Sequence, residues 1–124
     1  MAEVQRCMSA ACGVCRTGSG LRQALDDLRM LAQQGVRRDD MALSRSIEAA
    51  NILEVAQSVA LAALQRDESR GPHLRFATED SLRPVPPDEE RWSRYIGIRR
   101  AEGGPVATVR EPVRPATGPE KASC

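Results

Sequence analysis

One stretch of this 124-residue chain limits its fold more than any other, the segment ANILEVAQSVALAALQR at residues 50–66. Its apolar residues occupy most of a helical circumference, so a helix formed here needs apolar neighbours on more than one side. The chain has only one Trp, one Tyr and one Phe. Aliphatic packing between helices must therefore supply most of the core, and the length is enough for one such domain.

Helical periodicity in the flanking sequence predicts the neighbours that this helix needs. The predicted helices are residues 4–11, 21–34, about 41–70 and a short turn at 88–94. Gly35 is a natural end for the second helix, and Gly71 followed by Pro72 would end the long one. We therefore predict a mainly α fold, a three- to four-helix antiparallel bundle with short connections.

The composition of the chain divides it into three parts. Residues 1–75 carry the helical patterns and form the predicted bundle. Residues 76–114 begin proline-rich and extended and then contain YIGIRR and VATVRE, two short strands of a β-hairpin that completes the same domain. Residues 115–124 have no core-forming pattern, so we expect a disordered tail.

Composition also excludes some partners. Lys and Arg number 18 against 17 Asp and Glu, so the chain lacks the basic face of a nucleic-acid binder, and few aromatic rings are available for stacking on bases. No window approaches the ~20 apolar residues that span a bilayer. The start, MAEVQRCMSAAC, does not resemble a secretory signal. We expect a cytoplasmic protein without membrane insertion.

The motif CGVC at residues 12–15 raises the question of a metal or redox site. A structural zinc site needs four ligands, and only Cys7, Cys124 and His73 remain to complete one. A thioredoxin-type motif needs a strand before the cysteine pair, whereas a helix is predicted there. We interpret the cysteines as small buried or half-buried thiols and keep a zinc or redox site as a minor alternative.

Two further chemical signals are weaker. The segment GVCRTGSG at 13–20 has the glycine spacing of a phosphate-binding loop, but Ser19 stands where the lysine is required. His73 has no evident acid or nucleophile partner, so a hydrogen-bonded histidine beyond a helix end explains it best. The residues alone therefore predict no catalytic, cofactor-binding or metal-binding site.

Residues 51–76, NILEVAQSVALAALQRDESRGPHLRF, resemble the C-terminal helical domain of the succinate dehydrogenase and fumarate reductase flavoprotein family, which includes L-aspartate oxidase. In that family a long helix typically reads N-L-L-x-V-A and then A-x-x-R-x-E-S-R-G-x-H-x-R. The matching residues are Asn51, Ala63, Arg66, Glu68, Ser69, Arg70, Gly71, His73 and Arg75. The cluster from 68 to 75 is far more specific than a glycine spacing.

The resemblance extends over roughly residues 3–114. Upstream, the matching residues are Gln5, Met8, Gly13, Val14, Arg16 and Leu21. Cys15 falls at a variable position between two of them, which agrees with a structural thiol. Downstream, DEERW resembles an acidic stretch before a tryptophan, and REPV resembles the tail of the reductase members. Phe76, Ala77 and Thr78 depart from the family, which usually has an acidic residue and an aromatic–proline pair there.

The resemblance implies an FAD-dependent parent enzyme that moves a hydride from or to a four-carbon dicarboxylate or aspartate. The family's flavin site and catalytic residues belong to an N-terminal dinucleotide-binding fold and a capping domain, which this sequence does not contain. The resemblance therefore implies that this chain alone binds no cofactor. The implied partners are an FAD-binding domain or flavoprotein subunit and, further, an iron–sulfur subunit at the inner face of the membrane.

Three interpretations of the chain follow. The first is the C-terminal helical domain, or a fragment, of a succinate dehydrogenase or fumarate reductase flavoprotein, with a structural and docking role. The second is the corresponding part of an L-aspartate oxidase. The third is a stand-alone helical module for protein interaction. An exposed apolar face would distinguish a docking domain from an adapted module, which should have replaced it with polar residues.

A charged segment after the longest helix is the candidate docking site. Its residues are Glu68, Ser69, Arg70, Gly71, His73 and Arg75. The sequence leaves two roles open, because the same density of charge could instead form an internal network that ties the helix end to the bundle.

We expect Arg70→Ala to weaken binding to a matching flavin-binding domain more than it lowers the melting temperature of the bundle. Titration calorimetry and thermal unfolding measure the two effects separately. A lower melting temperature with unchanged affinity would contradict the docking role of Arg70.

Overall fold

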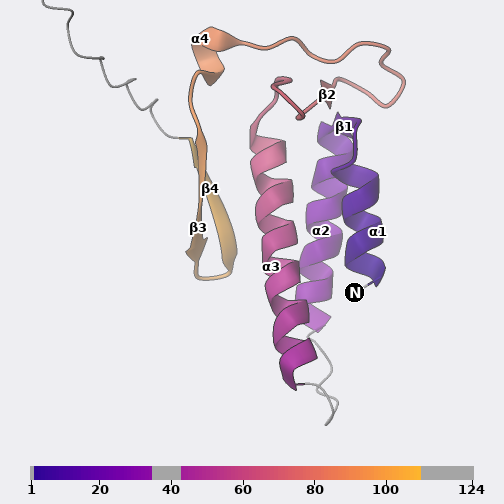
Figure 1. The fold of residues 1–124 in the computed structure, drawn as a ribbon, viewed down its shortest axis with the longest axis vertical. Coiled ribbons are helices and arrows are strands. Elements are labelled where there is room, and N and C mark those ends of the chain that lie inside the picture. The colour runs from indigo at the N-terminus through magenta and orange to yellow at the C-terminus, as the bar shows by residue number, and fades with distance from the viewer. Residues whose placement is uncertain (1, 35–42, 110–124) are drawn as a thin grey trace, which may run out of the picture.

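The computed structural model describes residues 2–34 and 43–109. Helices α1 (Ala2–Ala11), α2 (Gly18–Gln34) and α3 (Leu43–Gln65) stand side by side and alternate in direction (Figure 1). A fourth, short helix α4 (Glu89–Trp92) follows an extended segment. These elements and a β-hairpin confirm the predicted mainly α fold.

Two small sheets complete the structure. Strand β3 (Ile96–Ala101) pairs antiparallel with β4 (Gly104–Val109), which confirms the hairpin. Its turn contains Gly103 and Gly104 at φ of 89° and 125°, a conformation that favours glycine. Strands β1 (Arg16–Thr17) and β2 (Arg75–Phe76) form a parallel pair that the sequence did not predict. This pair joins the turn after α1 to the segment after α3.

The core lies where α1, α2 and α3 meet. Leu28 of α2 and Ala60 of α3 are fully buried there. The other core residues are Val4, Leu25, Leu53 and Ala56. The side chains of Cys7, Met8 and Cys12 pack against this cluster from α1 and its end. Aliphatic packing between helices thus forms the core, as expected.

Helix α3 has neighbours on two sides and is open on a third. Helices α1 and α2 cover one side, and the hairpin packs on another, where Arg100 forms an ion pair with Glu54 at 3.4 Å. By length and composition α3 could cross a membrane, contrary to the expectation that no segment could. Only 22% of its most apolar 18-residue window is buried in this domain. The absence of membrane insertion stays a prediction.

Two predicted helix boundaries were wrong. Helix α2 begins at Gly18, inside the segment predicted as a turn, because the Thr17 hydroxyl accepts a hydrogen bond from the Gly20 N–H at 3.1 Å and caps the helix. Helix α3 ends at Gln65 rather than near residue 70. Gly71, at φ of 53°, instead sits in a tight turn where Arg70 and His73 exchange backbone hydrogen bonds.

Some predictions fall outside the described residues. These are the helix end at Gly35 and the disordered tail at 115–124. The division into residues 1–75 and 76–114 stays a prediction.

Replacing Leu28 by Ala should lower the free energy of unfolding by about 2–5 kcal/mol, because the side chain is fully buried in the core and leaves a cavity. Leu82→Ala is the matched control, since Leu82 is 97% exposed and should change stability by less than about 0.5 kcal/mol. Urea denaturation measures both. Equal effects of the two substitutions would contradict the proposed core.

Candidate functional site

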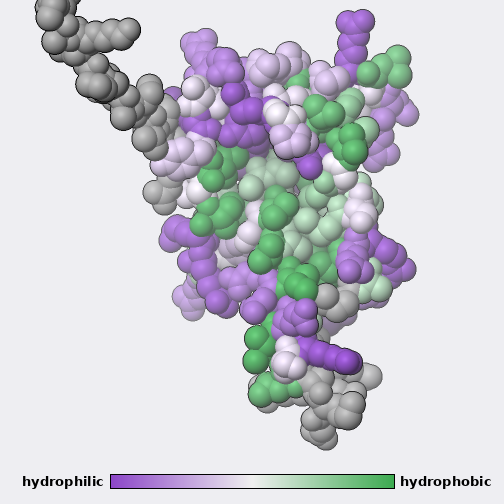
Figure 2. Space-filling view, in the orientation of Figure 1, coloured by the Kyte–Doolittle hydropathy of each residue, from purple (hydrophilic) through white to green (hydrophobic). Residues whose placement is uncertain are grey.

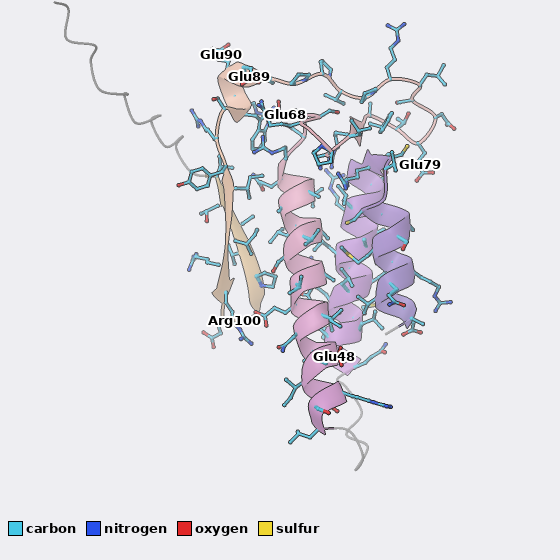
Figure 3. All side chains as sticks on the ribbon, in the orientation of Figure 1. Glu48, Glu68, Glu79, Glu89, Glu90 and Arg100 are labelled. Atoms are coloured by element: carbon cyan, nitrogen blue, oxygen red, sulfur yellow. The ribbon has the colours of Figure 1, made fainter. Side chains whose placement is uncertain are left out.

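The predicted docking segment centres on a buried carboxylate. Glu68 is 1% exposed and accepts hydrogen bonds from Arg66 Nη1 at 2.8 Å, from Arg70 Nε at 2.6 Å and from Arg70 Nη2 at 3.2 Å. The backbone N–H of Asp88, the N-cap of α4, donates a further short hydrogen bond to it. Figure 3 shows Glu68 at the end of α3, near Glu89 on α4. The carboxylate therefore fastens the end of α3 to α4.

The electrostatics of Glu68 follow from these contacts. Burial alone would raise its pKa, but the hydrogen bonds from Arg70, the Asp88 N–H and Arg66 outweigh burial and lower the pKa to about 2. The same carboxylate, together with Glu89 at 2.9 Å from Arg70 Nη1, raises the pKa of Arg70. Glu68 is ionised at neutral pH and fully paired, which suits it to a structural role.

Ser69 and Arg75 form the second part of the network. The Ser69 hydroxyl accepts from the Arg75 N–H at 2.9 Å and donates to the Arg75 carbonyl at 3.2 Å. The Ser69 N–H donates to the Val85 carbonyl, and the Val85 N–H donates to the Arg75 carbonyl. These bonds hold the extended segment after residue 76 against the end of α3.

His73 links this segment to the turn between α1 and α2. Its Nε2 lies 3.1 Å from the Arg66 carbonyl, and its Nδ1 lies 3.2 Å from Arg16 Nη1. A carbonyl only accepts and a guanidinium only donates, so the contacts fit a neutral imidazole with its proton on Nε2. Burial, and the nearby charges of Arg16, Arg75 and Arg66, lower the pKa of His73. His73 is therefore neutral at pH 7, and among residues 2–34 and 43–109 its ring contacts a carbonyl and a guanidinium rather than an acidic partner.

Asp67, which precedes Glu68, binds two side chains of α4. Asp67 accepts from Trp92 Nε1 at 2.6 Å and from Arg91 Nη2 at 2.7 Å. The Trp92 ring, 4% exposed, lies below the guanidiniums of Arg66 and Arg91, at 5.0 and 5.4 Å from its centroid. The acidic stretch before a tryptophan, noted in the sequence, is thus packed onto the end of α3.

A second group of cations lies at the start of α2. Arg75 is 7% exposed and donates from Nη1 to the Ala63 carbonyl at 3.3 Å. A methyl group on Gly18 would meet Arg75 Nη2 at 3.0 Å and Arg22 Nη1 at 3.4 Å, so the two guanidiniums converge there. Burial lowers the pKa of Arg75, opposed by the charge of Asp67 and reinforced by that of Arg22.

The thiols of Cys7, Cys12 and Cys15 take no part in this network. Cys7 donates its thiol hydrogen to the Ala24 carbonyl at 3.6 Å. Cys7 and Cys12 are half-buried as predicted, but Cys15 is exposed, so the prediction of a buried or half-buried thiol was wrong for Cys15. Burial raises the pKa of both Cys7 and Cys12, so at neutral pH they are thiols rather than the thiolates that bind metals or attack disulfides. Within residues 2–34 and 43–109, no group of three or more His, Cys, Asp and Glu could hold a metal ion.

The structure thus brings together all six residues of the predicted segment, and they form an internal network. Glu68, Ser69 and Arg75 are buried, whereas Arg70, Gly71 and His73 reach the surface. The sequence did not predict that Arg16 and Trp92 join them. One available signal was that Trp92 is the single tryptophan of the chain and follows charged residues. A buried Trp N–H needs a hydrogen-bond partner, and those neighbours could have been expected to lie near one. A docking role for the six residues stays a prediction.

Comparison with protein families gives the identity of the domain. Residues 1–121 match the family described as fumarate reductase flavoprotein C-term. The chain belongs to this family. The resemblance carried by residues 51–76 is therefore confirmed, and the chain has the C-terminal helical domain of these flavoproteins.

Named relatives come from both branches of the family. The chain is 40% identical over 73 residues, 59% of its length, to L-aspartate oxidase of Mycobacterium tuberculosis, of which this covers 13%. It is 30% identical over 120 residues, 90% of its length, to the fumarate reductase flavoprotein subunit of the same species, of which this covers 20%. The chain thus spans a fifth or less of the length of these relatives.

Two solved structures share the fold. One is FrdA of Escherichia coli quinol fumarate reductase, with a TM-score of 0.78, 24% identity and coverage of 96% of this chain and 21% of the other. The second, from the Sdh1 complex of Mycobacterium smegmatis, has a TM-score of 0.62, 26% identity and coverage of 90% and 19%. The bundle, the hairpin and their arrangement are therefore those of a flavoprotein C-terminal domain.

We expect Glu68→Gln to lower the free energy of unfolding by roughly 3 kcal/mol at pH 7, because it removes the charge that Arg66 and Arg70 pair with. Glu89→Gln is the control, since Glu89 is exposed and its ion pair with Arg70 lies at the surface, and should cost less than about 1 kcal/mol. Urea denaturation measures both.

The effect of Glu68 should also depend on pH. Its folded-state pKa of about 2 lies below the usual 4.5, so its contribution is present at neutral pH and is lost as the pH falls from about 5 towards 2. The gap in stability between the wild-type chain and Glu68→Gln should shrink over that range. A gap that stays constant would contradict the ion pairs.

Proposed function

We propose that this chain is the helical docking domain of an FAD-dependent oxidoreductase of the succinate dehydrogenase and fumarate reductase type. In this proposal the domain acts structurally, while FAD and the substrate are held by a flavin-binding part outside this sequence. The family match over residues 1–121 supports the parent enzyme. The observation that carries the docking role is the open apolar face of α3.

Val55 and Val59 are four residues apart and are therefore neighbours on one side of α3. Leu43 and Ile47, also four apart, form a second pair nearer the start of the helix. Ile47, Val55 and Val59 are 53%, 61% and 46% exposed, and Leu43 extends the row at 71%. Figure 2 shows hydrophobic surface along α3 on this side of the molecule, with hydrophilic surface above it near α4. Exposed Asn51 lies between the two pairs, and exposed apolar side chains gathered along a helix in this way are typical of an interaction surface.

The row ends in a groove at the upper part of α3. This groove has a volume of about 360 Å³, and its lining residues are Arg16, Val59, Ala62, Ala63, Arg66, His73 and Ile96. Its lining combines apolar side chains with the two arginines, so it can take an apolar side chain from a partner and an adjoining acidic one. We name the row and this groove together the α3 face.

The predicted docking segment borders the α3 face. Glu68, Ser69 and Arg75 hold the segment in place from inside, and Arg70, Gly71 and His73 present its surface. In this proposal the internal network shapes the segment and the partner contacts only its outer part. The two roles left open by the sequence are then compatible.

The choice of partner follows from the relatives. They are at least five times longer than the matched region, and an adapted stand-alone module would show a polar surface on α3 instead. Because the chain is similar to both branches, the choice of substrate, a four-carbon dicarboxylate or aspartate, would be determined by the flavin-binding part. For a dehydrogenase or reductase complex we propose an iron–sulfur subunit as a further partner and a cytoplasmic location at the inner membrane face.

The docking role can be tested by supplying the domain in trans. The fumarate reductase flavoprotein subunit of Mycobacterium tuberculosis would be expressed without its matched C-terminal region and together with this chain. Its own C-terminal region, as a separate chain, is the positive control. Elution of this chain together with the flavin absorbance supports the proposal. If the control chain elutes with the flavin absorbance and this chain does not, the proposal is overturned.

In that experiment Val59→Asp should weaken association at least tenfold, because it places a charge on the α3 face, and should leave the melting temperature nearly unchanged, because Val59 is 46% exposed. Leu82→Asp is the control, since Leu82 is an exposed apolar residue outside the α3 face. Titration calorimetry measures the affinities. Equal affinities for the two variants would place the interface elsewhere.

A further inference from the structure

The arginines near the end of α3 fall into two groups. Arg66, Arg70 and Arg91 each bind a carboxylate, at 2.8, 2.6 and 2.7 Å respectively. In the second group no ion pair with Asp or Glu occurs among the described residues. Its members are Arg16, Arg22 and Arg75, and we name them the arginine cluster.

The cluster is held together by backbone rather than by opposite charge. Arg16 donates from Nη1 to the Pro72 carbonyl and from Nε and Nη2 to the Cys12 carbonyl, at 3.1, 3.2 and 3.0 Å. Arg75 donates to the Ala63 carbonyl, and its other terminal nitrogen approaches Gly18 beside Arg22. Carbonyl oxygens orient a guanidinium but do not neutralise it.

This arrangement is electrostatically unfavourable in the isolated domain. Arg75 is 7% exposed, and a buried charge without an opposite charge is costly. The charge of Asp67 favours ionised Arg75, but that carboxylate already binds Trp92 and Arg91. The charges of Arg16 and Arg75 also disfavour protonation of His73. An anion beside the cluster would relieve the repulsion.

The cluster is continuous with the α3 face. Arg16 lines the groove together with Ala63, whose carbonyl holds Arg75. Arg22 is exposed and, within the part of the chain that the structure describes, forms no hydrogen bond or ion pair, so its guanidinium beside Gly18 is available to a ligand. A partner that covers Val59 would therefore reach the cluster with the adjoining part of its surface.

We infer that the arginine cluster receives acidic side chains, Asp or Glu, of the flavin-binding part that covers the α3 face. This inference rests on the proposed function and adds the chemistry of the contact. Three guanidiniums from the α1–α2 turn, α2 and β2 offer bidentate geometry to carboxylates. A protein surface fits the position better than a free anion, because the cluster adjoins an apolar face that a small anion would leave uncovered.

The test is charge reversal at Arg22 in the association experiment described above. Arg22→Glu should weaken binding to the flavin-binding part about tenfold or more, and should reduce the dependence of affinity on salt. Arg29→Glu is the matched control, because Arg29 is an exposed arginine two turns along α2 that pairs with Asp26 at 3.2 Å; its affinity should stay within about twofold of wild type. Thermal unfolding checks that both variants remain folded.

The outcomes separate the inference from the proposed function. Binding that Arg22→Glu and salt leave unchanged overturns the inference while the docking role stands. Failure of the wild-type chain to bind, when the positive control binds, overturns both. A third outcome is that inorganic phosphate stabilises the free chain, that Arg22→Glu abolishes this stabilisation, and that the variant does not change association. This outcome would assign the cluster to a small anion and overturn the inference as well.

Discussion

The structure depends on one buried carboxylate, that of Glu68, and on the arginines that neutralise it. It stops α3 at Gln65, because Arg66 and Arg70 turn back to bind it instead of continuing the helix. The Glu68 carboxylate also accepts a hydrogen bond from the backbone N–H of Asp88, the N-cap of α4. A charge buried this deeply is tolerated only when it is fully paired, so the chain around it has little freedom to adopt other arrangements.

The rest of the upper end of the domain is built outward from that carboxylate. Ser69 pairs with Arg75 and fixes the extended segment, His73 binds Arg16 and fixes the turn after α1, and Asp67 holds Trp92. The segments that cross the end of the bundle are thereby stabilised by polar contacts in a chain with few aromatic residues. The consequence for function is that α3 keeps exposed apolar side chains, bordered by arginines that form no ion pair with the described residues, and this surface is what a partner would meet.

Much of this could be predicted from the sequence and part could not. The bundle and hairpin follow from periodicity, since the leucine stripe of α2 and the alternation at 96–109 each fit one structure. The end of α3 could not be placed, because residues 66–70 have good helical propensity and only the tertiary contacts of Glu68 override it. Family resemblance singled out six residues that lie in this network, but the links of Arg16 to His73 and of Asp67 to Trp92 span 57 and 25 positions, which no local pattern reveals.

The most direct test of the account is to recover this chain from an extract of its own cells under mild conditions and to measure the mass and the flavin absorbance of the species that contains it. The docking role predicts a species much larger than 13.5 kDa with about one flavin for each copy of the chain. That result would make the domain part of a working flavoprotein, with FAD held by the remainder. A small, colourless species would contradict the docking role and leave the α3 face to some other partner.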